Sequence, residues 1–167
     1  MKTNIKLIAV LFFVLNSICF AQWGGGLSLN LKNEWPQKGI NFIVTHKLPF
    51  QWPLIGISVR FDAAYFKEKI PDVIERDLHL SLAGTLFYKD FQPYFAVGAG
   101  YAFHSANDVE SNSFLFHEIA GVQLAVIKPV YPFVEIKLLQ YLSELQQGRT
   151  NALSFQVIGA IGLKLEF

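Results

Sequence analysis

The chain has 167 residues, a length that suits one domain, and its formal net charge at neutral pH is +1. It contains no basic run, so its charge pattern gives no indication of a nucleic-acid partner. Hydrophobic residues make up 52% of the chain, yet no run of eighteen apolar residues follows the N-terminal region, which argues against a helical membrane protein. The heavy aromatic load, with sixteen Phe, six Tyr and three Trp, suits either a soluble β core or the lipid face and interfacial girdles of a membrane barrel.

The first 21 residues have the pattern of a secretory signal peptide. Two lysines precede an apolar segment at residues 7–15, and residues 19–21 (C-F-A) form a small-x-small cleavage site. We therefore expect cleavage after Ala21 and a mature β-barrel domain over residues 22–167.

Cys19 is the single cysteine of the chain and raises the alternative of a lipoprotein anchor. Ile18, directly before it, is a poor match to the small residue that such an anchor requires. Cleavage after Ala21 would remove the cysteine, so we expect neither a disulfide nor thiol chemistry in the mature chain.

The rest of the chain alternates between apolar and polar residues with a period of two, which predicts β-strands with two unlike faces. We expect eight strands, over residues 24–32, 39–47, 54–66, 76–88, 91–104, 114–126, 132–141 and 152–167. The third shows the pattern clearly, with an apolar face opposite small and charged residues: Ile57, Val59 and Phe61 against Ser58, Arg60 and Asp62.

The last predicted strand, residues 152–167, decides the fold class. Its larger face is apolar along the whole length: Leu153, Phe155, Val157, Gly159, Ile161, Leu163, Leu165 and Phe167. A terminal strand of a soluble sandwich would be shorter, whereas a long strand with one continuous apolar face is typical of a membrane-barrel wall, with lipid outside and a polar lumen inside. The prediction is an all-β, eight-stranded antiparallel up-and-down transmembrane β-barrel.

The predicted connections alternate between two kinds. Those that are short or apolar cover residues 47–53, 89–90 and 128–131, and those that are mostly longer and polar cover 33–38, 67–75, 105–113 and 142–151. Outer-membrane barrels have short periplasmic turns and longer external loops. With an even number of strands, both termini are therefore expected on the periplasmic side.

Ionisable residues gather on the smaller, inward faces of the strands, and we predict that they form the polar contents of the lumen: Arg60, Asp62, Glu135, Lys137, Lys164 and Glu166. An eight-stranded barrel is just wide enough for its own side chains, and an unpaired buried charge is costly. We therefore expect ion pairs, such as Glu135 with Lys164, that plug the lumen; a narrow gated pore is the alternative. Glu118 falls on an outward face, which is a defect unless it lies near the headgroups.

A group of residues with catalytic side chains surrounds the predicted third external loop: His104, Ser105, Asp108, Glu110, His117 and Glu118. A histidine, a serine and a carboxylate can form a hydrolytic triad. The adjacent histidine and serine should point apart on a strand, however, and no motif fixes their geometry. His46 and His79 are isolated, so we expect them to pack at the rim or in the lumen. With no G-x-S-x-G, phosphate loop or Cys/His cluster, we predict no catalytic residue, metal or cofactor.

Three segments resemble OmpA-like, porin-family outer-membrane barrels. Residues 93–101 (P-Y-F-A-V-G-A-G-Y) are similar to their central strand, and residues 132–137 (P-F-V-E-I-K) to their penultimate strand. Residues 162–167 (G-L-K-L-E-F) look like the terminal signal that the barrel-insertion machinery reads, with Leu163, Leu165 and Phe167 as its apolar positions. The resemblance implies an integral outer-membrane protein of a Gram-negative bacterium, inserted by that machinery and surrounded by outer-membrane lipid.

The leading functional hypothesis is a monomeric, non-enzymatic outer-membrane barrel with a structural or surface-interaction role and a plugged lumen. Two alternatives remain open from the sequence. A secreted soluble barrel of lipocalin type would bind a small apolar ligand, but it requires apolar residues inside and polar residues outside. A lipid A-modifying outer-membrane enzyme or a narrow pore would keep the membrane fold and add a chemical or conducting site.

Overall fold

The computed structural model describes residues 23–32, 38–67, 73–106, 109–125, 128–142 and 153–167. The predicted signal peptide and its cleavage site lie outside these residues. In the part of the chain that is described, no helix has the length and apolar character needed to cross a membrane.

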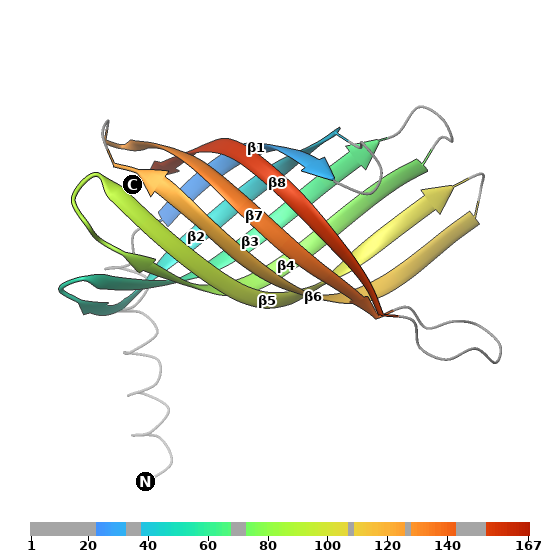
Figure 1. Ribbon diagram of the computed structural model, residues 1–167, viewed down its shortest axis with the longest axis horizontal. Helices are drawn as coiled ribbons and strands as arrows, with labels where there is room; N and C mark the ends of the chain where they lie inside the picture. The colour runs from blue at the N-terminus through green and yellow to red at the C-terminus, as the bar shows by residue number, and fades with distance from the viewer. Residues whose placement is uncertain (1–22, 33–37, 68–72, 107–108, 126–127, 143–152) are drawn as a thin grey trace, which may run out of the picture.

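The described residues form eight strands: β1 (Trp23–Lys32), β2 (Lys38–Trp52), β3 (Ile55–Lys67), β4 (Val73–Leu86), β5 (Phe91–Ala106), β6 (Val109–Leu124), β7 (Val130–Leu142) and β8 (Leu153–Glu166). Each strand pairs antiparallel with the next, and β1 pairs with β8, so the sheet closes into a barrel (Figure 1). The predicted all-β, up-and-down antiparallel class is therefore confirmed. The β2–β3 and β4–β5 hairpins lie at the same end of the barrel as the C-terminus, and the β5–β6 hairpin lies at the other (Figure 1).

Two predicted connections are largely strand. Residues 47–53 were expected to turn, but β2 continues to Trp52 through an irregularity in its pairing with β3 between Lys47 and Gln51. Proline is tolerated at such bulges, which explains how Pro49 lies within a strand. Residues 105–113 were expected to form a polar loop, but β5 and β6 stay paired up to Ala106 and Val109. Polar residues continue that ladder without the alternation that would reveal a strand.

The pairing is staggered around the barrel. Following successive partners from Leu27 once around the sheet leads to Leu153 on β8, whereas the direct β8 partner of Leu27 is Leu163, ten residues further along that strand. A stagger of this kind tilts the strands and fixes the width of the barrel. It also places inward side chains of β3 and β7, which are four strands apart, on opposite walls of the same narrow lumen.

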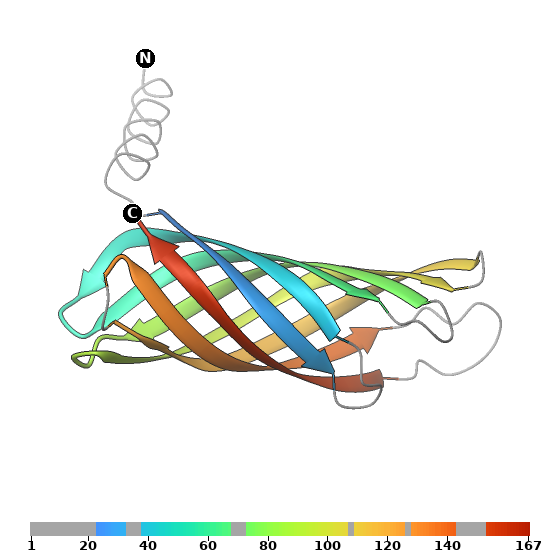
Figure 2. The same ribbon diagram turned by 90° about the horizontal axis from the view of Figure 1, so that it is seen from above.

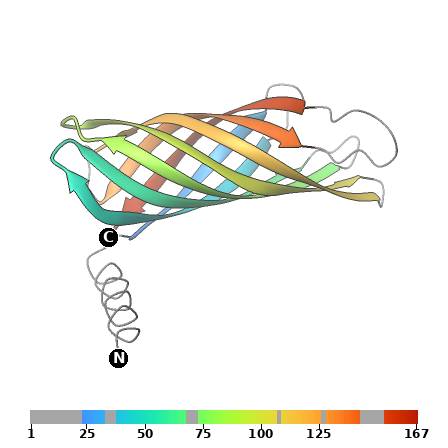
Figure 3. The same cartoon turned by 90° about the horizontal axis from the view of Figure 1, so that it is seen from below.

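The outward face of every strand is mostly apolar and exposed. Leu29 is 62% exposed, Leu80 58%, Phe95 52% and Ile161 61%. These residues belong to β1, β4, β5 and β8, and the β1–β8 pair lies on the opposite side of the barrel from β4 and β5 (Figures 2 and 3). The inward face carries small, polar and charged residues that are buried. The predicted sidedness, with apolar rows outside and ionic rows inside, is confirmed.

The lumen is less polar than expected. An apolar cluster fills part of it with fully or nearly fully buried side chains: Ala64, Phe66, Ala102, Leu115, Leu139, Tyr141 and Ile158. These residues come from five strands and meet toward the end of the barrel that carries the β5–β6 hairpin, which we call the loop end. Sequence alternation assigns such residues to the inward face but does not show that they gather in one place.

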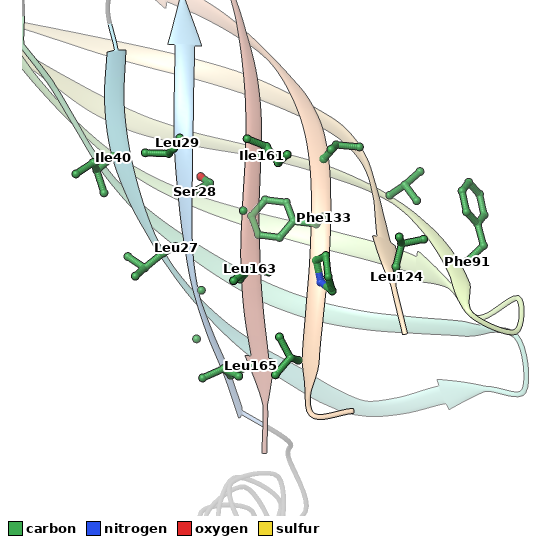
Figure 4. Close-up of a pocket in the computed structure, with 17 residues that line it drawn as sticks. Leu27, Ser28, Leu29, Ile40, Phe91, Leu124, Phe133, Ile161, Leu163 and Leu165 are labelled. Atoms are coloured by element: carbon green, nitrogen blue, oxygen red, sulfur yellow. The ribbon is translucent and has the colours of Figure 1, made fainter. Parts of the chain in front are cut away.

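A broad hollow of about 1370 Å³ lies on the outer wall over β1, β6, β7 and β8. Leu27, Leu29, Ile161, Leu163 and Leu165 stand around it from β1 and β8 (Figure 4). These residues belong to the same apolar outer surface, so the hollow is part of the face that meets lipid in a barrel of this kind.

Candidate functional site

The inward charges of β3 and β7 meet across the lumen in a central ion cluster of Arg60, Asp62, Glu135 and Lys137. Residues two apart on a strand share a face, so each strand presents one cation and one anion inward. All four are buried, with exposed fractions of 4% for Arg60, 0% for Asp62, 4% for Glu135 and 1% for Lys137. The cluster therefore holds two positive and two negative groups and is electrically balanced.

Arg60 is the centre of this cluster. Its Nε and Nη2 donate to Asp62 at 2.7 and 2.8 Å, and its Nη1 and Nη2 donate to Glu135 at 2.7 and 2.8 Å. Lys137 Nζ lies 3.0 Å from Asp62 Oδ1 and 3.3 Å from Glu135 Oε1. Bidentate guanidinium–carboxylate contacts are strong and directional, so they hold the opposite walls β3 and β7 together.

Neutral residues complete the coordination of the two carboxylates. Asn41 Nδ2 on β2 donates to Asp62 Oδ1 at 2.7 Å, and the Tyr94 hydroxyl on β5 donates to Glu135 Oε2 at 2.5 Å. The cluster thus receives side chains from four of the eight strands. A buried ionic group is tolerated when its remaining hydrogen-bonding positions are satisfied, as they are here.

A second set of polar residues lies in the lumen near the C-terminal end of β8. Lys164 Nζ is 2.8 Å from Glu166 Oε1, and Lys47 Nζ on β2 is 2.5 Å from Glu166 Oε2. Gln123 Nε2 donates to Gln92 Oε1 at 2.8 Å, next to this pair. Between this set and the central ion cluster the lumen leaves a cavity of only about 20 Å³, bounded in part by Arg60, Tyr94 and Lys164.

A third set lies toward the loop end of the barrel around Glu75 on β4. Lys32 on β1 forms an ion pair with Glu75, and the Tyr141 hydroxyl donates to the same carboxylate at 3.0 Å. Lys32 Nζ also lies 4.0 Å from the centroid of the Phe66 ring, a cation–π contact. His104 Nδ1 is 3.6 Å from Glu75 Oε2. This set joins the ionic residues to the apolar cluster of the lumen.

A histidine cluster of Asp77, His79 and His117 lies between the central and the loop-end sets. The rings of His79 and His117 are stacked with centroids 4.8 Å apart, and His79 Nε2 is 3.9 Å from Asp77 Oδ2. All three side chains are buried, and the ring nitrogens of His79 and His117 have no hydrogen-bond partner among the described residues. Gly98 and Gly100 on β5 leave room for the rings, because a Cβ at either position would crowd His117 or His79.

Among the described residues, no three His, Cys, Asp or Glu side chains are arranged to hold a metal ion.

No protein-family model and no curated protein sequence matches this chain. Solved structures do match it along most of its length. The N-terminal β-barrel domain of Pseudomonas aeruginosa OprF is 8% identical and covers 87% of this chain and 97% of its own, with a TM-score of 0.63. The outer membrane enzyme PagL is 12% identical over 85% and 98% of the two chains, with a TM-score of 0.57. Neisserial surface protein A is 14% identical over 88% and 96%, with a TM-score of 0.53.

The fold is that of a small eight-stranded outer-membrane β-barrel. At these sequence identities the likeness shows the fold alone. The role of the chain has to be inferred from its own residues. In such a barrel the exposed apolar surface faces lipid and the buried ionic residues line the lumen.

Among the described residues, the two histidines that the sequence offered for a hydrolytic triad lie apart. His104 points inward to Glu75, whereas His117 lies deeper in the lumen against His79. Glu118 is exposed on the outer face, opposite its neighbour His117. Asp108 lies outside the described residues, and the placement of the Glu110 side chain is likewise not described. His46 packs against Trp23 near the start of β1, with ring centroids 4.4 Å apart.

The predicted lumen residues are all inward, but their partners differ from the expected ones. Glu135 was expected to pair with Lys164; it pairs with Arg60 and Lys137 instead, and Lys164 pairs with Glu166. The reason is the stagger of the strands, which brings β7 opposite β3 at the level of Glu135.

Sequence reasoning missed the ionic role of Lys32, Glu75 and Lys47. Glu75 was placed in a loop, although the alternation of Glu75, Asp77 and His79 with Arg76 and Leu78 was a usable signal.

Proposed function

We propose that the chain is an integral outer-membrane barrel protein with a structural or surface-interaction role and without catalytic activity. One observation carries this proposal: apolar side chains cover the outside of the closed sheet while charged side chains are buried in its centre. Soluble proteins seldom expose a continuous apolar surface of this extent. The soluble lipocalin-type alternative requires the opposite sidedness, which the barrel does not have.

The proposed orientation places both termini in the periplasm. The β2–β3 and β4–β5 hairpins at the C-terminal end of the barrel are tight, which is the usual form of periplasmic turns. Leu163, Leu165 and Phe167 stand on the outward face of β8 and beyond it, with exposed fractions of 55%, 41% and 75%. An exposed apolar row at the end of the last strand suits recognition by the barrel-insertion machinery, so we propose these residues as the insertion signal.

The membrane assignment can be tested on the membrane fraction of a Gram-negative host that expresses the chain. We expect the protein to stay in the membrane pellet after a detergent-free wash and to migrate faster on a gel before boiling than after it. A protein released into the supernatant, or one whose mobility does not depend on heating, would contradict the proposal and favour the soluble alternative.

We propose that the lumen is plugged by its own side chains. The central ion cluster joins opposite walls, and the space beside it is about 20 Å³, near the volume needed for one water molecule. We expect purified protein in planar lipid bilayers to show no steady ion conductance at neutral pH. Reproducible conductance steps would contradict the plug and favour the narrow-pore alternative.

A lipid A-modifying activity is the remaining alternative, because the chain shares its fold with the outer membrane enzyme PagL. The contacts of His104, whose nearest ionic partner is Glu75 in the lumen, do not favour it. We expect the lipid A mass spectrum of a host to be the same with the native chain, the His104→Ala variant and the empty vector. A mass change that requires the native chain and disappears with His104→Ala would overturn the non-enzymatic assignment.

A further inference from the structure

Three basic residues gather on the outer face of the barrel near its loop end. Lys38 on β2, Lys67 on β3 and Arg76 on β4 stand on the outward rows of neighbouring strands, and all three are exposed (Figure 1). The described outward residues of these three strands include no acidic residue. The described outward rows of the other five strands hold no lysine or arginine. Positive charge on the outer wall is therefore concentrated on one side of the barrel.

The pairing of the strands brings the three cations together into what we call the basic patch. Lys38 and Lys67 are direct partners across β2 and β3, and Arg76 is the direct partner of Tyr65, which is two positions from Lys67 on the same face. Direct and diagonal neighbours on one face of a sheet are within reach of long side chains, and like charges at such positions repel each other. An anion placed among the three side chains would relieve this repulsion.

The basic patch lies at the edge of the apolar outer belt. The next outward residues toward the turns are Ile40 on β2, Tyr65 on β3 and Leu78 on β4, and all three are exposed. Tyrosine is enriched at the membrane–water interface, where its ring meets lipid and its polar end meets the headgroups. In the membrane-inserted barrel, the long basic side chains just beyond this row therefore reach the headgroup layer.

We propose that the basic patch binds a phosphate group of a lipid headgroup in the outer leaflet, and that this lipid is lipid A. The inference rests on the proposed membrane location, with the loop end outside the cell. Phosphates of lipid A are the lipid anions at this depth of the outer leaflet, and clustered basic residues recognise anionic headgroups. Within the described part of the chain, no hydrogen bond or ion pair engages Lys38 or Arg76, so both are available to such a ligand.

A lipid fits this surface better than an acidic protein does, because the basic patch continues directly into the apolar belt. Phe42, Phe61 and Leu80 lie further toward the turns on the same three strands and are exposed. A phosphate on the basic patch would place the acyl chains of the same molecule against these side chains. Arginine makes bidentate contacts with phosphate and lysine acts as a point charge, so the patch offers both kinds of contact.

Binding of lipid A to the purified chain tests the proposal. The full chain is extracted from the outer membrane in detergent and titrated with lipid A that carries its phosphates or has lost them, with EDTA present to remove bridging cations. Native mass spectrometry measures each dissociation constant. We expect the phosphorylated form to bind at least about tenfold more tightly, because each basic side chain adds to the attraction. Equal binding of the two forms, or equally tight binding of phosphatidylglycerol, overturns the proposal.

Substitutions locate the site. Lys38→Gln/Arg76→Gln should weaken the binding of phosphorylated lipid A by about tenfold. Lys38→Arg/Arg76→Lys keeps both charges and should stay within about threefold of the native chain. The matched control Lys89→Gln/Lys128→Gln removes the same charge from exposed turns at the opposite end of the barrel, where salt screens its effect, so the change should stay below about twofold. An unchanged constant in the first variant, or an equal loss in the control, overturns the proposal.

Heat-dependent gel mobility shows, before each titration, that a variant has formed the barrel. A variant with normal mobility and weakened binding has lost the site and not the fold. The comparison of the two forms of lipid A needs no substitution, so it decides the matter even where a variant does not fold. Failure of the membrane assignment would appear separately, as release of the native chain from the membrane pellet in a detergent-free wash.

Discussion

The central ion cluster and the histidine cluster occupy the same narrow lumen, but their side chains form hydrogen bonds and ion pairs to very different degrees. In the first, Arg60 donates to two carboxylates and Lys137 lies between them. In the second, the side chains of His79, His117 and Asp77 are just as buried, yet the ring nitrogens of both histidines have no hydrogen-bond partner among the described residues. Because the two clusters are similarly buried but differ in hydrogen bonding, substitutions in the first should lower the free energy of unfolding much more than substitutions in the second.

The difference teaches that burial alone does not identify a polar residue that stabilises the barrel. Removing one member of a buried, fully paired ionic network leaves its partners charged, unpaired and out of reach of water, which is costly. Removing a polar group that has no partner costs little, and an apolar side chain of similar shape can be as good or better. The following variants, in order of expected effect, measure this contrast by urea-induced unfolding in phospholipid vesicles, followed by tryptophan fluorescence.

Arg60→Met should have the largest effect, because it leaves Asp62 and Glu135 buried with Lys137 as their remaining cation. We expect the free energy of unfolding to fall by about 3–5 kcal/mol, the range for breaking a buried ion pair from one side. The double variant Arg60→Met/Glu135→Gln should recover part of this loss, because it removes one of the stranded charges. A loss below about 1 kcal/mol in the single variant would show that the cluster does not hold β3 and β7 together.

Tyr94→Phe should have the next largest effect. It removes the hydroxyl that donates to Glu135 at 2.5 Å and leaves the ring in place. A hydrogen bond to a charged group contributes about 1.5–3 kcal/mol, and we expect a loss in that range. Tyr101→Phe, on the outward face of the same strand, is the control and should change the unfolding free energy by less than about 0.5 kcal/mol.

Gly98→Ala should destabilise the barrel by about 1–3 kcal/mol, the usual cost of overpacking. A Cβ at Gly98 would lie 2.7 Å from the His117 Cε1 atom and 2.7 Å from the Ser81 backbone, and closer still to the Leu80 carbonyl. Gly84→Ala is the matched control, because nothing lies within 4 Å of the corresponding Cβ on the outer face. Equal effects at the two glycines would show that β5 does not need the space beside the histidine rings.

His117→Leu should have the smallest effect, within about 1 kcal/mol in either direction, because its ring nitrogens have no hydrogen-bond partner in the part of the chain that the structure describes. The leucine side chain fills similar space against His79. A loss above about 2 kcal/mol would show that His117 is satisfied in the membrane-inserted protein and that the two clusters do not differ as the structure indicates.

Much of this architecture follows from the sequence because the side-chain period is two and one face must meet lipid. Arg60, Asp62, Glu135 and Lys137 were each assigned to the lumen by alternation alone, and Phe155, Ile161 and Leu163 to the outer wall. The strand ends were less predictable. Beyond the apolar belt the ladder of β5 and β6 continues through Ser111 and Asn112, which are neighbours on the strand and both exposed, so the alternation ends there.

The choice of partners could not be read from the sequence. Glu135 meets Arg60, 75 residues away, only because the stagger brings β3 and β7 opposite each other at one level. A different stagger would bring a different cation next to Glu135, and the predicted partner Lys164 was one such cation. The stacking of His79 on His117 has the same origin, with Gly98 and Gly100 as the one local hint that large side chains share that space.

The ion pairs that join β3 to β7 across the lumen also affect how the strands of the barrel reach their correct register. Arg60 and Asp62 share β3, but Arg60 and Glu135 can meet only when the strands between β3 and β7 have aligned, so the contact across the lumen requires the assembled sheet. A slip of a single residue in β3 would turn Arg60 toward the acyl chains, where a basic side chain near the bilayer centre costs about 2–4 kcal/mol, and would also break the cluster. The four side chains of the central ion cluster thus penalise misaligned intermediates and favour one arrangement of the sheet.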